Sequence, residues 1–239
     1  MTLLTEPTRI VLAKGQPVPV DLQGFGSVPL LLHGNGTNGS TTITDSSLTP
    51  KTVTAVGNAQ ISTAESKFGG ASIGCISPSG QLSVAASQDF AFGSGDFTIE
   101  LWYYPTTDTS NQFVFTQYTA TQGIGSHGLT FNYEINNITW YLNGNASTRI
   151  LQTGGLPAIN AWTHIAGVRN NGVVKLYFNG VALADQETIL SSMGKSNEVF
   201  EFGSSIKPVI GYMDDIRITK GVARYTANFT PPTAPFPDI

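Results

Sequence analysis

The chain has 239 residues, of which 12% are charged, about half the fraction of roughly 25% that is usual in soluble domains. A helical bundle needs Glu, Lys and Arg for its solvated faces, so this composition argues against one. Ser, Thr, Asn and Gln must supply the surface instead, and they suit strands and turns. The net charge of −4 lacks the basic footprint of nucleic-acid binding. A single cysteine excludes an internal disulfide and a cysteine-rich zinc site.

Residues 1–28 differ in texture from the rest of the chain. Pro7, Pro17 and Pro19 remove backbone donors that a central strand needs. We interpret this segment as an extended arm for anchoring or oligomerisation, followed by one compact domain at 29–239; a disordered leader or an edge strand explains the pattern equally well. The chain starts without the basic residues and apolar run of a signal peptide, and no stretch reaches the roughly 18 apolar residues of a membrane span. We therefore expect synthesis in a cytoplasm and no membrane insertion.

From residue 29 the hydrophobic period is two, as in half-buried strands. The clearest case is 97–103, where one face takes Phe97, Ile99, Leu101 and Tyr103 and the other takes Thr98, Glu100 and Trp102. Asn-Gly pairs at 171–172 and 179–180 tolerate the positive φ angles of tight hairpin turns, so they predict a three-stranded meander over 164–183. Another strand is expected at 209–218. Many short strands with frequent turns predict an all-β antiparallel sandwich.

Five segments, taken in order, carry a resemblance to a known fold. They are LLLHGNGTNGS at 30–40 with TDSS at 44–47, SKFGGAS at 66–72, DFTIELW at 96–102, WTHIA through LYFNG at 162–180, and GYMDDIRI running into GVARY and FTPP at 211–232. Together they resemble the concanavalin A-like, laminin-G-type jelly-roll domain, specifically the version found in bacteriophage virion proteins. The resemblance covers residues 29–239 and implies two antiparallel sheets packed face to face, a fold often used for binding glycans or proteins. Fold alone does not settle function.

Some relatives with this fold hydrolyse glycans, using paired carboxylates roughly 5–5.5 Å apart in retaining enzymes. The candidate acids here are Glu100 alone, Glu198 with Glu201, and Asp214 with Asp215. Strand residues that are three apart or adjacent point to opposite faces, so no pair fits. We expect His164 to be structural and Cys75 to be a small core residue. The sequence therefore predicts that the chain is not an enzyme.

The resemblance also implies one structural calcium ion, because related jelly rolls often hold one with an aspartate on the last strand. Asp214 matches that aspartate, Asp45 in the opening loop is a second possible oxygen ligand, and Asn35 stands where many relatives have an Asp. Alternation places Asp214 on the same face as Ile216 and Ile218, with Arg217 on the other. A carboxylate on an apolar face needs a partner or a cation. The alternative is a hydrogen bond from backbone amides to Asp214.

Aromatic residues are the usual platform for sugars. The glycan-binding candidates are Trp102, Tyr104, Tyr118, Trp140 and Tyr141. Core packing is the competing role for each of them, since a sandwich core also needs aromatic side chains.

The sequence favours a non-enzymatic bacteriophage virion structural protein that displays a lectin-like domain, as a tail fibre or host-recognition adhesin. The alternatives are a capsid decoration protein of the same fold and a carbohydrate-binding module outside a virion. Residues 1–28 would contact other virion proteins, and the domain would bind a host surface glycan. Phage architecture implies a homo-oligomer, a trimer if the protein is a fibre, that is assembled in the host cytoplasm and displayed on the virion surface.

Overall fold

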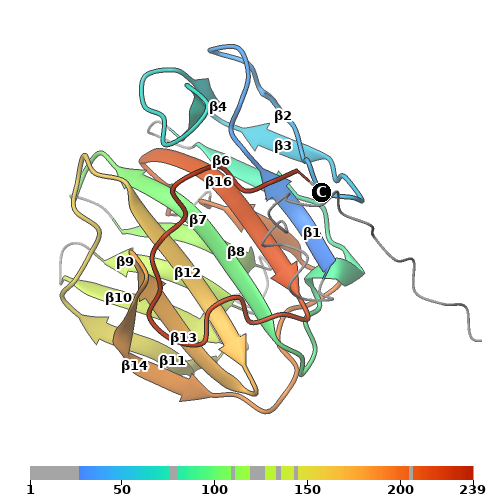
Figure 1. Cartoon of the computed structure of the whole chain (residues 1–239), viewed down its shortest axis with the longest axis vertical. Coiled ribbons are helices and arrows are strands. Elements are labelled where there is room, and N and C mark those ends of the chain that lie inside the picture. Colours follow the sequence, from blue (N-terminus) through green and yellow to red (C-terminus); the bar gives the residue numbers. More distant parts are fainter. Residues whose placement is uncertain are drawn as a thin grey trace, which may run out of the picture.

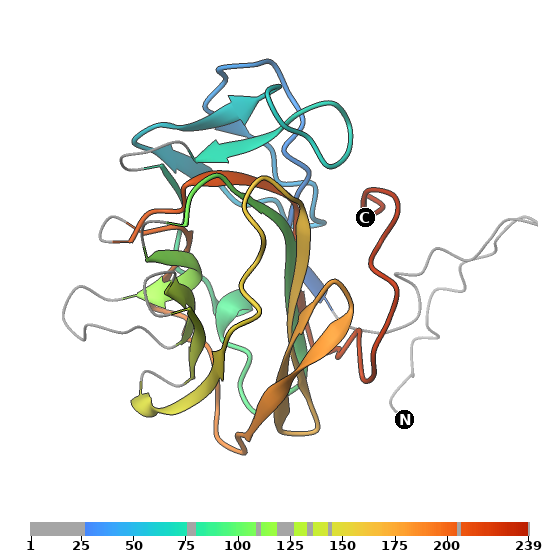
Figure 2. The same ribbon diagram turned by 90° about the vertical axis from the view of Figure 1, so that its left-hand side faces the viewer.

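The computed structural model describes residues 27–75, 80–108, 111–118, 127–132, 136–142, 145–204 and 207–238. These residues form two antiparallel sheets packed face to face, with one short 3-10 helix, η2 (Gln88–Phe90) (Figure 1, Figure 2). The predicted all-β sandwich is confirmed. Of the predicted arm, residues 1–26 lie outside the described residues, and Ser27 and Val28 already belong to a strand. No helix in the described part of the chain is long and apolar enough to cross a membrane.

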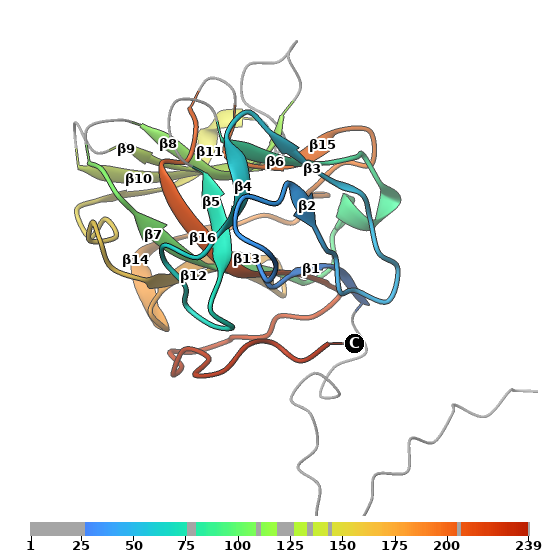
Figure 3. The same ribbon diagram turned by 90° about the horizontal axis from the view of Figure 1, so that it is seen from above.

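We call the two layers sheet I and sheet II; Figure 3 shows them from above. Sheet I has eight strands, in the spatial order β14 (Val181–Thr188), β13 (Val173–Phe178), β12 (Thr163–Asn170), β7 (Phe97–Pro105), β16 (Gly211–Lys220), β5 (Ser72–Cys75) and β4 (Ala59–Ser62), with β1 (Ser27–Leu32) beside the second half of β16. Sheet II also has eight, in the order β11 (Asn145–Thr153), β10 (Asn137–Leu142), β9 (His127–Asn132), β8 (Gln112–Tyr118), β15 (Val199–Phe202), β6 (Gln81–Val84), β3 (Val53–Val56) and β2 (Thr42–Ile43).

The core between the sheets follows the predicted alternation. Phe97, Ile99, Leu101 and Tyr103 of β7 all point into it and are fully buried. From sheet II, Trp140 meets Phe97 edge-on at a centroid distance of 6.5 Å. Gly167 of β12 makes room for this indole, because a Cβ atom there would lie 2.5 Å from the Trp140 ring. Cys75 is fully buried as predicted, and burial raises the pKa of its thiol to about 12.

The predicted meander is confirmed in β12, β13 and β14, which pair in sequence order. Asn171 and Gly172 have φ angles of 49° and 84°, and Asn179 and Gly180 have 46° and 76°. Both turns therefore use the left-handed conformations that Asn-Gly pairs adopt at low cost.

A β-bulge in β16 overturns the predicted facing of its residues. The pairing with β7 shifts between Asp214, which faces Trp102, and Arg217, which faces Glu100, and Asp215 has a φ angle of 49°. The extra residue puts Ile216 and Ile218 into the core while Asp214 and Arg217 share the outer face. The prediction that Asp214 lies on the same face as the two isoleucines, opposite Arg217, is therefore wrong.

A C-terminal strap, residues 221–238, runs in an extended path across the outer face of sheet I (Figure 1, Figure 2). Its Tyr225 and Phe229 pack on buried Ala166 and Tyr177. Phe229 N–H donates to Gly180 O at 2.9 Å, and a Cβ atom on Gly180 would lie 1.8 Å from Phe229 O. The strap covers the first part of the outer face of β7, where Thr98 and Glu100 have no exposed surface.

Candidate functional site

Three aromatic side chains form a row across the outer face of sheet I. Tyr104 of β7 pairs directly with Tyr212 of β16, and Trp162 precedes Thr163, which pairs with Tyr103. The Tyr104 ring centroid lies 5.3 Å from that of Trp162 and 5.9 Å from that of Tyr212. All three side chains are partly exposed. We call Trp162, Tyr104 and Tyr212 the aromatic row.

A carboxylate borders the aromatic row. The Tyr104 hydroxyl donates to Glu65 Oε1 at 3.3 Å, and desolvation together with the Glu65 carboxylate raises the pKa of Tyr104. The phenol therefore remains a donor at neutral pH. Beyond Tyr212 the row ends at Gly74 of β5, which has no side chain to cover the ring. The site thus offers partly exposed aromatic rings with a hydroxyl and a carboxylate beside them.

Trp102 lies next to this row but is covered. Its exposed fraction is 4%, with Phe68 against it edge-on at 6.0 Å and Lys67 Nζ 3.8 Å from the centre of its ring. On the other side it contacts His164 at a centroid distance of 5.1 Å. The loop that carries Lys67 and Phe68 therefore keeps the Trp102 ring from being a free stacking surface.

The other sequence candidates do not join the aromatic row. Trp140 is fully buried in the core, so its role is packing. Tyr141 is partly exposed on β10 of sheet II, and the side chain of Tyr118 lies outside the described residues. Of the five candidates, Tyr104 alone is in the row. Trp162 and Tyr212 were not among the binding residues expected from the sequence, although strand alternation from Tyr103 and Met213 puts Tyr104 and Tyr212 on the outer face.

Glu100 forms a buried ionic cluster beneath the strap. Its Oε1 accepts from Arg217 Nε and Nη2 at 2.9 and 2.8 Å, and its Oε2 accepts from the Tyr225 hydroxyl at 2.7 Å. Burial alone would raise the pKa of Glu100, but Arg217, His164 and Tyr225 outweigh it and hold the pKa at about 2. His164 is fully buried and lies edge-on to Tyr225 and to Phe229. Glu100 is thus a permanently charged anchor for the strap, and His164 is structural as predicted.

The bulge in β16 turns Asp214 and Asp215 toward the same, outer face of sheet I, so the prediction that these adjacent acids point apart is wrong, but each is held by partners of its own. Glu198 is 3% exposed and lies 3.5 Å from Lys195 Nζ. Glu201 of β15 accepts from Gln81 Nε2 at 3.2 Å, and burial raises its pKa. Each of these two acids thus contacts a side chain of its own, Lys195 for Glu198 and Gln81 for Glu201.

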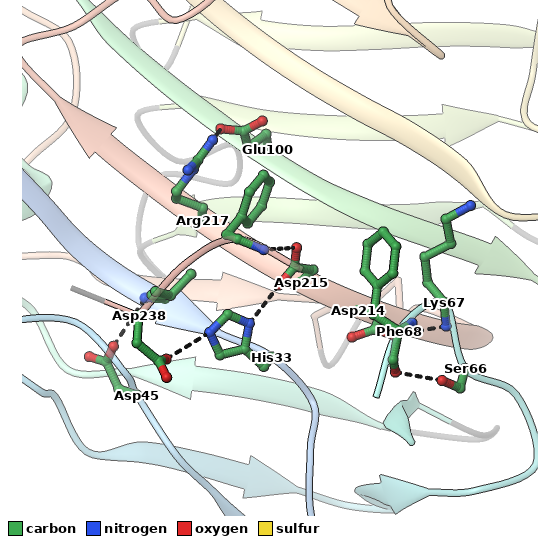
Figure 4. A network of polar contacts seen from close by, with 12 residues as sticks. His33, Asp45, Ser66, Lys67, Phe68, Glu100, Asp214, Asp215, Arg217 and Asp238 are labelled. Atoms are coloured by element: carbon green, nitrogen blue, oxygen red, sulfur yellow. Dashed lines mark hydrogen bonds and ion pairs between the residues drawn. The ribbon is translucent and has the colours of Figure 1, made fainter. Parts of the chain in front are cut away.

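The two proposed calcium ligands are separated and engaged elsewhere. Asp45 Oδ1 accepts from the amides of Leu31 and Ser47, each at 3.0 Å, and Oδ2 accepts from Lys51 N at 2.7 Å. Amide N–H groups satisfy an anion and cannot ligate a cation. Figure 4 shows Asp45 and Asp214 on opposite sides of His33. The residues therefore do not fit a site that joins both aspartates.

Asp214 itself is held by backbone amides. Its Oδ2 accepts from Lys67 N and Phe68 N at 2.9 and 3.0 Å (Figure 4), which is the alternative considered from the sequence. Its Oδ1 is buried with no hydrogen-bond partner among the described residues, and burial raises the pKa of Asp214 to about 7. No group of three or more His, Cys, Asp or Glu suited to a metal ion occurs within the described ranges.

His33 links the end of the strap to β16. Its Nδ1 lies 2.6 Å from Asp215 Oδ1, and its Nε2 lies 3.1 Å from Asp238 Oδ1 (Figure 4). Asp215 Oδ2 also accepts from Phe236 N at 2.8 Å. The Asp215 hydrogen bond and the two negative charges outweigh burial and raise the pKa of His33. The bulge at Asp215 aims this carboxylate at the strap, which sequence reasoning did not anticipate.

Comparisons with solved structures show the fold. The chain is 17% identical to the binding domain of botulinum neurotoxin serotype D, with a TM-score of 0.61 over 83% of this chain and 49% of that one. The chain is 16% identical to the binding domain of Paraclostridial Mosquitocidal Protein 1, with a TM-score of 0.60 over 83% of this chain and 50% of that one. It is also 16% identical to the binding domain of botulinum neurotoxin DC in complex with SialylT, with a TM-score of 0.60 over 83% of this chain and 49% of that one. The chain thus spans about half the length of these structures.

The sequence comparisons decide the family. No curated protein matches the chain. A family model described as the Concanavalin A-like lectin/glucanases superfamily matches residues 78–224, which is more than half of the chain. The match, together with the sandwich of two antiparallel sheets, confirms the concanavalin A-like jelly roll that the sequence resembles. The chain belongs to the Concanavalin A-like lectin/glucanases superfamily.

Proposed function

We propose that this protein is a non-enzymatic, glycan-binding domain displayed on a bacteriophage virion, where it serves as a tail fibre or host-recognition adhesin. The observation that carries the binding role is the aromatic row, in which Tyr104 of β7, Tyr212 of β16 and Trp162, just before β12, present partly exposed rings. Pyranose rings place apolar C–H faces on aromatic rings and direct their hydroxyls outward, where the Glu65 carboxylate can accept them.

The shape of the site indicates the kind of glycan. Neighbouring strands lie about 4.8 Å apart, so three rings on successive strands extend over roughly 10 Å. An open row of this length suits a few consecutive sugars of a linear polysaccharide rather than one enclosed sugar. Such open sites bind weakly one at a time, and display on a homo-oligomer, a trimer in a fibre, would raise the avidity.

The virion setting rests on the resemblance of GYMDDIRI at 211–218, with the segments that follow it, to phage proteins. In this proposal residues 1–26 attach the domain to other virion proteins after assembly in the host cytoplasm. A role in binding is also supported by the similar toxin structures, which are binding domains, one of them in complex with SialylT. Capsid decoration by the same fold is the second candidate.

The glycan role is tested on an array of bacterial cell-envelope polysaccharides. We expect the native protein to bind at least one of them, and Trp162→Ala and Tyr212→Ala to weaken that binding about tenfold or more. Tyr141→Ala removes a partly exposed ring from sheet II and serves as the matched control, with unchanged binding. If the native protein binds no polysaccharide, glycan recognition is wrong and decoration is favoured.

The virion role needs its own experiment. A chain that lacks residues 1–26 retains every described strand, since β1 begins at Ser27. We expect it to fold and to keep the melting temperature of the whole chain but to be absent from assembled particles. Normal incorporation of the truncated chain would show that the arm is not the anchor.

A further inference from the structure

A pocket lies on the outer face of sheet I, at the opposite end of β12 from the aromatic row. It is a pocket of about 280 Å³ between the meander and the strap. Trp162 precedes β12 and Asn170 ends it, so at about 3.3 Å per residue the two sites are roughly 25 Å apart. The pocket lining includes Asn171, Lys175, Tyr177, Gln186, Tyr225 and Thr226.

Strand pairing and strap contacts make the walls of this pocket firm. Lys175 of β13 pairs with Val168 on one side and with Gln186 on the other, so the three side chains form one row on the outer face. Tyr225 closes the pocket from the strap, where its ring stacks on Phe229 at 3.5 Å and its hydroxyl is held by Glu100. The positive φ of Asn171 sets the turn beside it.

The polar side chains of the lining are one cation and several neutral groups. Lys175 is its one cation and no carboxylate lines it, and within the described residues no acid forms an ion pair with Lys175. Side-chain amides of Asn171 and Gln186 and the Thr226 hydroxyl can each donate and accept hydrogen bonds. The Gln186 side chain has no hydrogen-bond partner in the described part of the chain. The pocket thus combines a free positive charge with groups that match sugar hydroxyls.

We propose that this pocket binds an acidic sugar, with the ligand carboxylate on Lys175 and its hydroxyls on the amides of Asn171 and Gln186. The volume of about 280 Å³ lies just below the roughly 300–1,000 Å³ usual for ligand pockets, which suits one pyranose ring better than a nucleotide. A single lysine matches the single charge of a carboxylate. The rings of Tyr177 and Tyr225 bound the apolar part of the pocket. This site is separate from the aromatic row and does not rest on it.

The decisive experiment compares trigalacturonic acid with its fully methyl-esterified form, which replaces each carboxylate by a neutral methyl ester, by titration calorimetry with the full chain. We expect the acid to bind about tenfold or more tightly than the ester, and rising salt to reduce that preference. Lys175→Gln should remove the preference. Lys207→Gln changes the net charge equally on a lysine whose Nζ lies over the Phe113 ring, so it is the matched control and should keep the preference.

Three results would overturn the proposal that this pocket binds an acidic sugar. They are equal binding of acid and ester, a preference that survives Lys175→Gln, and no binding of the acid by the native protein. Trp162→Ala separates this proposal from the preceding one. If Trp162→Ala no longer binds the acid while Lys175→Gln still binds it, the acid binds at the aromatic row. The proposed pocket site is then wrong, while the glycan-binding role stands.

Discussion

Glu100 and Arg217 face each other on adjacent strands of sheet I, with two guanidinium nitrogens 2.9 and 2.8 Å from the same carboxylate oxygen. The strap covers them, and their exposed fractions are 0% and 5%. The Arg217 Cζ lies 3.6 Å from the centre of the Phe236 ring. The pair therefore joins two central strands to the last residues of the chain.

We expect Glu100→Gln to lower the free energy of unfolding by about 3–5 kcal/mol, because Arg217 then remains buried without its carboxylate. Arg217→Met should cost a similar amount by leaving Glu100 unpaired. The double variant should lose less than the sum, since neither charge is left alone. Urea denaturation followed by tryptophan fluorescence measures all three. Losses below about 1 kcal/mol in both single variants would show that the pair is not an anchor.

His33 makes strap attachment sensitive to pH. Its pKa in the folded chain is raised above the ordinary value of 6.5, with the Asp215 hydrogen bond as the largest cause. A raised histidine pKa stabilises the fold fully below 6.5 and loses that contribution as the pH rises through the folded-state pKa. His33→Gln should remove this part of the pH dependence of the unfolding free energy.

Asp214 titrates in a neighbouring range, since its pKa is raised to about 7, so the His33 contribution is taken as the difference between native protein and variant. Asp214→Asn provides the control, because it should leave the His33 contribution in place. Identical pH profiles for native protein and His33→Gln would contradict the role of His33.

Gly167 is required by the indole of Trp140. In Gly167→Ala the new Cβ would lie 2.5 Å from the ring, so the core must shift, at a cost of about 1–3 kcal/mol in the free energy of unfolding. Gly95→Ala is the matched control, because its Cβ would meet nothing nearer than Phe92 O at 3.5 Å. Trp140→Phe in the Gly167→Ala background should restore part of the loss. Equal stabilities of the two alanine variants would refute this packing role.

The calcium ion implied by the resemblance can be tested with a chelator. Because both oxygens of the Asp45 carboxylate already accept from backbone amides, we expect a chelator to leave the melting temperature unchanged. Asp45→Ala should lower the free energy of unfolding by about 2–3 kcal/mol, equally with and without chelator. A chelator-induced decrease that disappears in Asp214→Asn would instead establish a cation at the unpaired Asp214 Oδ1.

Much of the fold could be predicted from local pattern. The period of two in 97–103 identified the inner face of β7, and the Asn-Gly pairs identified both turns of the meander. The bulge in β16 was not predicted, because strict alternation of side chains does not hold through Asp214 and Asp215. The apolar spacing, three residues from Met213 to Ile216 and two from there to Ile218, contained the signal.

The candidate site was less predictable, since it is made by strand order. Trp162, Tyr104 and Tyr212 come from three distant segments and meet because β7 lies between β12 and β16. Trp102 and Trp140 are as aromatic as the members of the row, but one lies beneath Lys67 and the other fills the core. Composition cannot predict which aromatic side chains are exposed, because exposure depends on which segments cover a residue.

By itself, the sequence determined the all-β class, the turns and the buried face of the central strand, because alternation and Asn-Gly backbone preferences act over a few residues. The folded arrangement was needed to show that the strap covers Glu100 on the outer face of sheet I, that Glu100 is a buried anchor, and that Asp45 and Asp214 lie apart. Those outcomes depend on long-range pairing and on a one-residue bulge, which set how side chains far apart in the chain meet.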